Sequence, residues 1–149
     1  MFRILIPVDG SECSDRAVKF LVKKASLFAE PLEIHLLNVQ HPFPGTIQGV
    51  HHQAQQHHHD EGMKAIASAR KLLDEKGVKY IFHIGVGEVA HVIEHYVKDK
   101  LIDQIVMSTH GQGAMLGMLM GSVATKVLHL VDVPVLLVKG AGVKPARLD

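Results

Sequence analysis

A glycine-rich stretch between residues 105 and 122 places the strongest constraint on the fold of this chain. Ile105, Val106 and Met107 favour a strand, and they run into a small polar loop rich in glycine before a helical pattern opens at Val123. A strand that ends in such a loop and leads into a helix N-terminus can hold phosphate with backbone N–H groups. Glycine allows this because it reaches positive φ freely and lets an anion approach the backbone without meeting a Cβ. The stretch therefore predicts a phosphate-binding loop at one edge of a parallel sheet.

Strand and helix patterns alternate along the rest of the chain. Short apolar runs predict strands at 4–8, 34–39, 78–84, 101–107 and 133–138, with helical patterns between them. This alternation predicts an α/β fold, in which a parallel sheet carries helices on both faces. Ligands of such sheets bind beyond the carboxyl ends of the strands, where the strand order reverses. If the first and fourth strands flank that point, Asp9 and the glycine loop face one crevice.

Two segments stand apart from this alternation. Residues 41–59 are polar and lack a helical period, so we expect a long solvated connection that acts as a lid, followed by a helix over 60–76. The cluster from His51 to His59 could bind zinc, nickel or copper. No cysteine or ordered acidic pattern accompanies these histidines, so we favour a polar lid with only weak, adventitious metal binding. Residues 141–149 are predicted to be a flexible tail after a single domain of residues 1–140.

Composition limits the possible classes of protein. The chain has 149 residues, 47% of them hydrophobic and 21% charged, which is typical of a globular domain. A net charge of +1 gives no reason to expect nucleic acid as a partner, and no apolar run is long enough to span a bilayer. Cys13 is the single cysteine, which excludes an internal disulfide and fits a reducing cytoplasm. The N-terminus does not resemble a signal peptide, so we expect a cytoplasmic protein.

Three blocks of sequence resemble the universal stress protein family. They cover residues 6–11 (IPVDGS), 105–111 (IVMSTHG) and 121–128 (GSVATKVL), and the resemblance extends from Ile4 to Lys139. Nucleotide-binding members of that family carry glycine, two residues, glycine, nine residues and then Gly-Ser or Gly-Thr. Gly111, nine intervening residues and Gly121-Ser122 match this pattern, whereas Ser108 replaces its first glycine. We expect this serine to weaken nucleotide binding relative to glycine.

The resemblance implies a Rossmann-like fold of the adenine-nucleotide alpha-hydrolase type, with strand order 3-2-1-4-5. It also implies that ATP binds with Mg or Mn: Asp9 and Val39 would flank the adenine and ribose, and Met107 would pack on the base. Gly111, Gly121 and Ser122 would receive the phosphates. The full set of expected binding residues is Pro7, Val8, Asp9, Val39, Met107, Ser108, His110, Gly111, Gly121, Ser122 and Val123. The family resemblance further implies a homodimer that pairs the last strand, from Val133 to Val138.

The residues leave three functions open. We favour a stress-response protein that binds ATP and acts as a regulatory dimer; the alternatives are a slow ATP hydrolase and a nucleotide-free dimeric scaffold. Phosphoryl transfer relies on metal and cations, and the sequence offers no arginine near the loop and no evident general base, so we predict no catalytic residue.

Single residues also carry two interpretations. Asp9 is either a ligand-binding residue or only a turn or capping acid. His110 either touches phosphate or is a solvated loop histidine. Cys13 follows the expected N-cap Ser11, where a thiolate would be favoured, but we favour a buried, inert cysteine.

Overall fold

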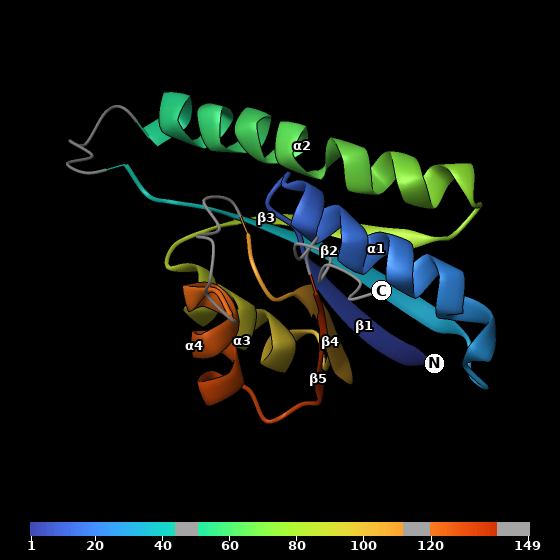
Figure 1. Cartoon of the computed structure of the whole chain (residues 1–149). Helices are drawn as coiled ribbons and strands as arrows, with labels where there is room; N and C mark the ends of the chain where they lie inside the picture. The colour runs from blue at the N-terminus through green and yellow to red at the C-terminus, as the bar shows by residue number, and fades with distance from the viewer. Residues whose placement is uncertain (44–50, 112–119, 140–149) are drawn as a thin grey trace, which may run out of the picture.

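A five-stranded parallel sheet with strand order β3-β2-β1-β4-β5 forms the centre of the molecule (Figure 1). The computed structural model describes residues 1–43, 51–111 and 120–139. Its strands are β1 (Phe2–Pro7), β2 (Leu32–Gln40), β3 (Tyr80–Val86), β4 (Gln104–Ser108) and β5 (Val135–Val138). The helices are α1 (Glu12–Lys24), α2 (His51–Glu75), α3 (Val89–Asp99) and α4 (Ser122–Leu130), and a 3-10 helix, η1 (Ala25–Leu27), follows α1. The predicted fold class and strand order are confirmed.

Helices cover both faces of the sheet, as the alternating pattern predicts. The helices α1 and α2 pack on one face, where their buried residues Val18, Leu21, Ile66 and Leu73 meet alternate residues of β1 and β2. The helices α3 and α4 pack on the other face, where the buried residues include Ala90, Ile93, Ala124 and Val127. Figure 1 shows α1 and α2 together on one side of the sheet, and α3 and α4 on the other. None of the described helices has the length and apolar character needed to cross a membrane.

The helix α2 begins earlier than the sequence predicts. We expected an irregular connection over residues 41–59, but residues 51–59 form the first turns of α2, and residues 44–50 lie outside the described part of the chain. These first turns are polar on nearly every side, and His52, His57 and His59 are exposed. Because a helical period is visible only where one face is buried, the sequence shows it only from Gly62 onward, where buried positions begin. The expected solvent exposure is confirmed for these three histidines, whereas the expected irregular structure is wrong for residues 51–59.

Strand boundaries differ from the predicted ones by at most three residues. Predicted to begin at residue 101, β4 begins at Gln104, because Leu101 has a positive φ of 52° in the turn that follows α3. At the end of the sheet, β5 begins at Val135 rather than Val133. Pro134 precedes it and has no N–H to donate, although its carbonyl accepts from the Ile105 N–H at 2.9 Å.

Two predicted burial states are also wrong. The apolar spacing of Val123, Val127, Leu128 and Val131 predicts that the last helix buries Leu128, but Leu128 is 41% exposed because α4 buries Ala124 and Val127 instead. Cys13 is only partly buried. The N-cap of α1 is as predicted: the Ser11 hydroxyl accepts from the Ser14 N–H at 3.2 Å.

A buried polar network explains the histidine within β2. His35 is 4% exposed, and its Nε2 and Nδ1 lie 3.0 Å from Glu33 Oε1 and 2.9 Å from the Tyr96 hydroxyl. A carboxylate only accepts, so Nε2 carries a hydrogen and donates it to Glu33. Arg3 Nε donates to the same carboxylate oxygen at 3.1 Å. The hydrogen bond from His35, assisted by that from Arg3, lowers the pKa of the Glu33 carboxyl.

The charge of Glu33 should therefore contribute to stability in a pH-dependent way. A carboxylate whose folded-state pKa is lowered stabilises the fold above its unfolded-state pKa, and this contribution is lost as the pH falls through the folded-state pKa. We expect Glu33→Gln to lower the free energy of unfolding by about 1 kcal/mol at neutral pH, and the difference from wild type to shrink below about pH 4. Urea unfolding at both pH values measures this.

Glu30→Gln is the matched control, because Glu30 is 63% exposed and, among the described residues, pairs with the N-terminal amine alone. Exposed pairs of this kind contribute little, so stability should stay close to wild type at both pH values. An equal loss for Glu33→Gln at neutral and acid pH would show that its charge is not the source.

Candidate functional site

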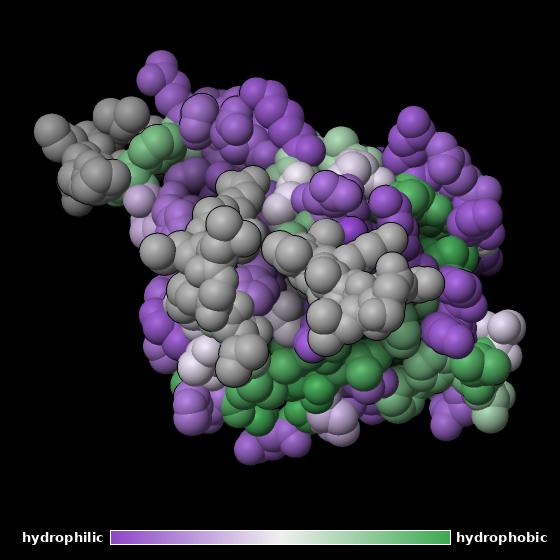
Figure 2. All heavy atoms as spheres, in the orientation of Figure 1, coloured by the Kyte–Doolittle hydropathy of each residue, from purple (hydrophilic) through white to green (hydrophobic). Residues whose placement is uncertain are grey.

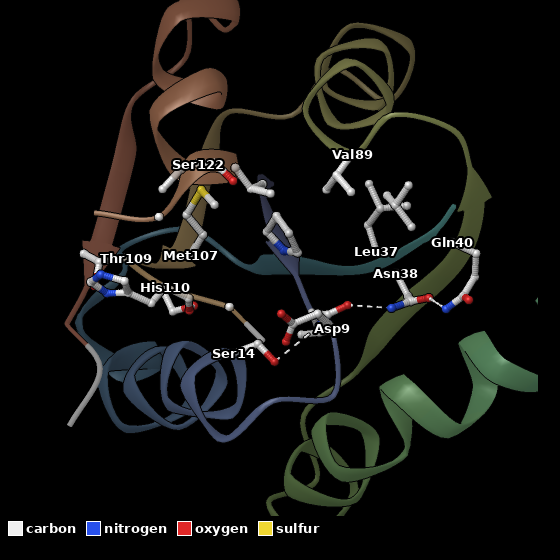
Figure 3. Close-up of a pocket in the computed structure, with 18 of the residues that line it drawn as sticks. Asp9, Ser14, Leu37, Asn38, Gln40, Val89, Met107, Thr109, His110 and Ser122 are labelled. Atoms are coloured by element: carbon white, nitrogen blue, oxygen red, sulfur yellow. Dashed lines mark hydrogen bonds between the residues drawn. The ribbon is translucent and has the colours of Figure 1, made fainter. Parts of the chain in front are cut away.

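A cleft of about 570 Å³ opens at the carboxyl ends of β1, β2 and β4 (Figure 3). Every residue predicted for the site lines it: Pro7, Val8, Asp9, Val39, Met107, Ser108, His110, Gly111, Gly121, Ser122 and Val123. Further lining residues not predicted from the sequence are Ser14, Leu37, Asn38, Gln40, His41, Val89, Thr109 and Ala124. The cleft lies where the chain order of the strands reverses, between β1 and β4. The geometry brings the predicted residues together, and their role in binding remains a prediction.

The turn after β1 fixes the position of Asp9. The Ser11 N–H donates to Asp9 Oδ1 at 2.9 Å, and the Asp9 N–H points to the Ser14 hydroxyl at 3.4 Å. The Ser14 hydroxyl in turn donates to the Ser11 carbonyl at 3.0 Å. The interpretation of Asp9 as a turn residue is confirmed, because Asp9 accepts a backbone hydrogen bond within the turn. Asp9 also lines the cleft, so a role in ligand binding stays a prediction.

Gly111 and Gly121 are needed for space rather than for backbone conformation. Neither is among the residues with positive φ. A Cβ added to Gly111 would collide with the Asp9 carboxylate, and one added to Gly121 would lie 3.1 Å from the Thr109 carbonyl oxygen. The sequence suggests two reasons for glycine here, positive φ and close approach of other atoms. Close approach applies to both positions, and positive φ applies to neither.

The N-terminus of α4 presents hydrogen-bond donors to the cleft. Gly121 is the N-cap and has no side chain to accept from the first turn. The N–H groups of Ser122, Val123 and Ala124 belong to that turn, where a helix offers no backbone partner, and all three residues line the cleft. The positive end of the helix dipole adds to these donors. This end of the cleft can hold an anion such as phosphate.

Two backbone hydrogen bonds of Thr109 hold this helix end in place. The Gly121 N–H donates to the Thr109 carbonyl at 2.6 Å, and the Thr109 N–H donates to the Val138 carbonyl at 3.1 Å. Thr109 itself is buried. The start of α4, the end of β4 and the end of β5 are therefore joined through one residue.

Apolar side chains form another part of the cleft lining. They are Leu37, Val39, Val89 and Met107, and Met107 is 5% exposed. A flat, apolar ring such as a nucleobase suits such a surface. Figure 3 shows Met107 and Ser122 on the same side of the cleft, with Val89 and Leu37 farther along.

Comparison with known proteins shows the family to which this fold belongs. The model of the universal stress protein family matches residues 1–139. The chain belongs to the universal stress protein family. Universal stress protein MJ0531 of Methanocaldococcus jannaschii is 34% identical over 139 residues, which cover 92% of this chain and 81% of that protein.

Solved structures of the family share the fold. Protein MJ0577 superposes with a TM-score of 0.78 at 28% identity, covering 95% of this chain and 97% of its own. A universal stress protein family member from Arabidopsis thaliana, solved with AMP bound, superposes with a TM-score of 0.67 at 19% identity and covers 93% and 92% of the two chains. At that identity the likeness concerns the fold alone.

The histidine cluster lies on α2, outside the residues that line the cleft. Phe43 stacks on His58 with ring centroids 4.7 Å apart, and His58 Nε2 lies 3.0 Å from the His41 carbonyl oxygen. Within residues 1–43, 51–111 and 120–139, no three His, Cys, Asp or Glu side chains are grouped so that they could hold a metal ion. Weak, adventitious metal binding by these histidines remains a prediction.

Ser108 departs from the family pattern without strain. Its φ is not positive, so a serine costs nothing in backbone conformation. Its side chain is buried and the hydroxyl donates to the His110 carbonyl at 2.5 Å. Thr109 Oγ1 lies 3.0 Å from His110 Nδ1. The serine therefore holds the first residues of the loop in a defined conformation.

Removing this hydroxyl should destabilise the loop. We expect Ser108→Ala to lower the free energy of unfolding by about 1 kcal/mol, the usual contribution of one buried hydrogen bond. We expect Ser108→Gly to lose roughly 0.5–1 kcal/mol more, because glycine gains freedom in the unfolded chain. Denaturant midpoints measure both, with the exposed Ser26→Ala as control. Unchanged stability of Ser108→Ala would show that the hydroxyl contributes nothing.

Proposed function

We propose that this cleft binds an adenine nucleotide, ATP together with Mg²⁺ or Mn²⁺, and that the protein acts in the cytoplasm as a regulatory dimer. The observation that carries the proposal is the pairing of an uncapped N-terminus of α4 with an apolar wall in one cleft. A nucleotide has this same division, with a charged phosphate chain at one end and a flat ring at the other.

The phosphate end fits the donors that the chain supplies. Backbone N–H groups of a helix N-terminus bind phosphate readily, and the Ser122 hydroxyl lies beside them in the lining of the cleft. The absence of a Cβ at Gly111 and Gly121 keeps the backbone accessible. A volume of about 570 Å³ falls within the range of pockets that take small molecules.

The single carboxylate of the described cleft lining fits a cation that the nucleotide brings with it. Asp9 is the one carboxylate among the described residues that line the cleft. Mg²⁺ typically keeps several waters and binds to one or two carboxylates plus substrate phosphates. A cation would thus be held by phosphate oxygens and water, with Asp9 as the candidate protein ligand. When bound, it would neutralise phosphate charge.

Binding rather than turnover is favoured by the charges around the cleft. Phosphoryl transfer is accelerated by cationic side chains at the transferred group. The described lining contains no lysine or arginine. We therefore propose regulation by nucleotide occupancy ahead of slow hydrolysis.

Titration calorimetry with MgATP on the full chain tests the proposal. We expect wild type to bind one nucleotide per chain, and Gly121→Val to show no detectable binding because the branched side chain occupies the anion position at the start of α4. Gly111→Ala should bind at least about tenfold more weakly, since its Cβ displaces the Asp9 carboxylate.

Gly77→Ala is the matched control for these variants. Gly77 has a φ of +63° and no atom within 4 Å of an added Cβ, so alanine there costs about 1 kcal/mol of stability away from the cleft. Its affinity for MgATP should equal that of wild type. No binding by wild type, or equal binding by Gly121→Val, would contradict the proposed function.

The edge strand β5 supports the proposed dimer. Its four residues pair only with β4 within the described chain, and Leu136 on β5 and Leu128 on α4 are exposed. Figure 2 shows apolar side chains gathered on the side of the molecule where β5 lies. An exposed apolar edge invites association, and a second copy pairing β5 with β5 would cover both edges symmetrically.

Leu136→Lys should therefore yield monomers, since a charged side chain would lie in the paired edge. Light scattering at micromolar concentration distinguishes the two states. Ile81→Lys is the control, because Ile81 is 49% exposed on β3, at the opposite edge of the sheet; it should remain dimeric. A monomeric wild type, or a monomer only with Ile81→Lys, would contradict pairing through β5.

A further inference from the structure

Two amide side chains stand at the end of β2, where apolar residues would otherwise be expected. Asn38 and Gln40 are separated by two positions and so lie on the same face of the strand. Asn38 is 2% exposed and Gln40 is partly buried, and both line the cleft. A buried amide is retained only where its hydrogen bonds are satisfied. The hydrogen bonds of these two residues therefore indicate what they do.

A directed chain of hydrogen bonds runs from β1 to Gln40. The Asn38 side-chain Nδ2 donates to the Val8 carbonyl at 2.9 Å, and Gln40 Nε2 donates to Asn38 Oδ1 at 2.7 Å. Figure 3 shows Asn38 between the chain at Asp9 and Gln40, with both bonds drawn.

The Val8 carbonyl determines the orientation of both amides. A backbone carbonyl can only accept, so the NH₂ group of Asn38 must face it. The Asn38 oxygen then faces Gln40 and can only accept, so the NH₂ group of Gln40 must face Asn38. The Gln40 side-chain oxygen Oε1 then points away from Asn38, and no partner for it is found among the described residues.

The backbone at Gln40 is fixed as well. Its carbonyl accepts from the Gly87 N–H at 3.0 Å, and the Val8 N–H donates to the Leu37 carbonyl at 2.9 Å. The strand end is thus held from both neighbouring sides, and the hydrogen bond from Gln40 Nε2 to Asn38 Oδ1 limits rotation of the Gln40 amide. An acceptor held in this way selects for a donor on the ligand.

We propose that Gln40 determines base specificity, with Oε1 accepting from the exocyclic amine of a 6-aminopurine, and that Asn38 is the positioning residue. This inference rests on the proposed nucleotide binding. A base with a 6-oxo group presents an acceptor at that position, so it would face Oε1 acceptor to acceptor. Asp9, the one carboxylate among the described residues of the lining, lies against Gly111 at the loop that follows β4.

Calorimetry with MgATP and MgITP tests the inference, because the two nucleotides differ at the 6-position of the purine. We expect wild type to prefer ATP by about tenfold, as one hydrogen bond in such a site would give. Gln40→Met keeps the length of the side chain and removes the acceptor, so the two nucleotides should bind nearly equally. Gln53→Met, on the exposed first turns of α2, should keep the preference of wild type.

Asn38→Leu tests the positioning role. Without Asn38 the Gln40 amide can turn over, so the preference for ATP should fall even where MgATP still binds. A purely structural effect would weaken both nucleotides equally and leave their ratio unchanged.

The possible outcomes separate this inference from the function on which it rests. Equal binding of ATP and ITP by wild type, or an unchanged ratio in Gln40→Met, overturns the role of Gln40 and leaves nucleotide binding intact. A wild type that binds neither nucleotide overturns the proposed function and this inference with it.

Discussion

The pairing of β1 with β4 is the constraint on which the cleft depends. It joins only two residue pairs, Ile4 with Gln104 and Leu5 with Ile105, whereas β1 and β2 are paired along six. Beyond this short seam the chain leaves β1 toward α1 on one face of the sheet and leaves β4 toward α4 on the other. Within the described residues no connection crosses the gap between the strand ends, and the cleft opens there.

The two walls of the cleft obtain their chemistry from different levels of structure. On the side of α4 the donors are backbone groups, which the helix supplies whatever its side chains are. On the side of β2 the polar groups are amide side chains, whose orientation is set by one backbone carbonyl. The wall at α4 suits an anionic group, and the wall at β2 suits the pattern of hydrogen-bond donors and acceptors on a nucleobase. Gly111 and Gly121 matter because, without a Cβ, their backbone can lie close to the Asp9 carboxylate and the Thr109 carbonyl oxygen.

The sequence predicts most of the fold because buried strands and one-sided helices leave a readable period. It fails where burial is absent: the first turns of α2 are polar nearly all round, so nothing distinguishes residues 51–59 from a loop. The eleven predicted site residues could be named because loop spacing and the family resemblance point to their positions in the sequence. Gln40 could not, since its importance arises from a hydrogen-bond chain between two strands; the unusual Asn38 in an apolar strand was the only signal. Leu128 was misplaced because a nine-residue helix buries too narrow a stripe for periodicity to resolve.

Thr109 connects helix α4 to strand β5 through its two backbone hydrogen bonds. Its carbonyl holds the start of α4 and its N–H holds the last residue of β5, so a single peptide segment ties the anion-binding end of the cleft to the outer edge of the sheet. A displacement of α4 toward or away from an anion must either carry that edge with it or break a hydrogen bond. As long as both hydrogen bonds hold, the anion-binding end of the cleft and the edge strand are coupled through this one residue.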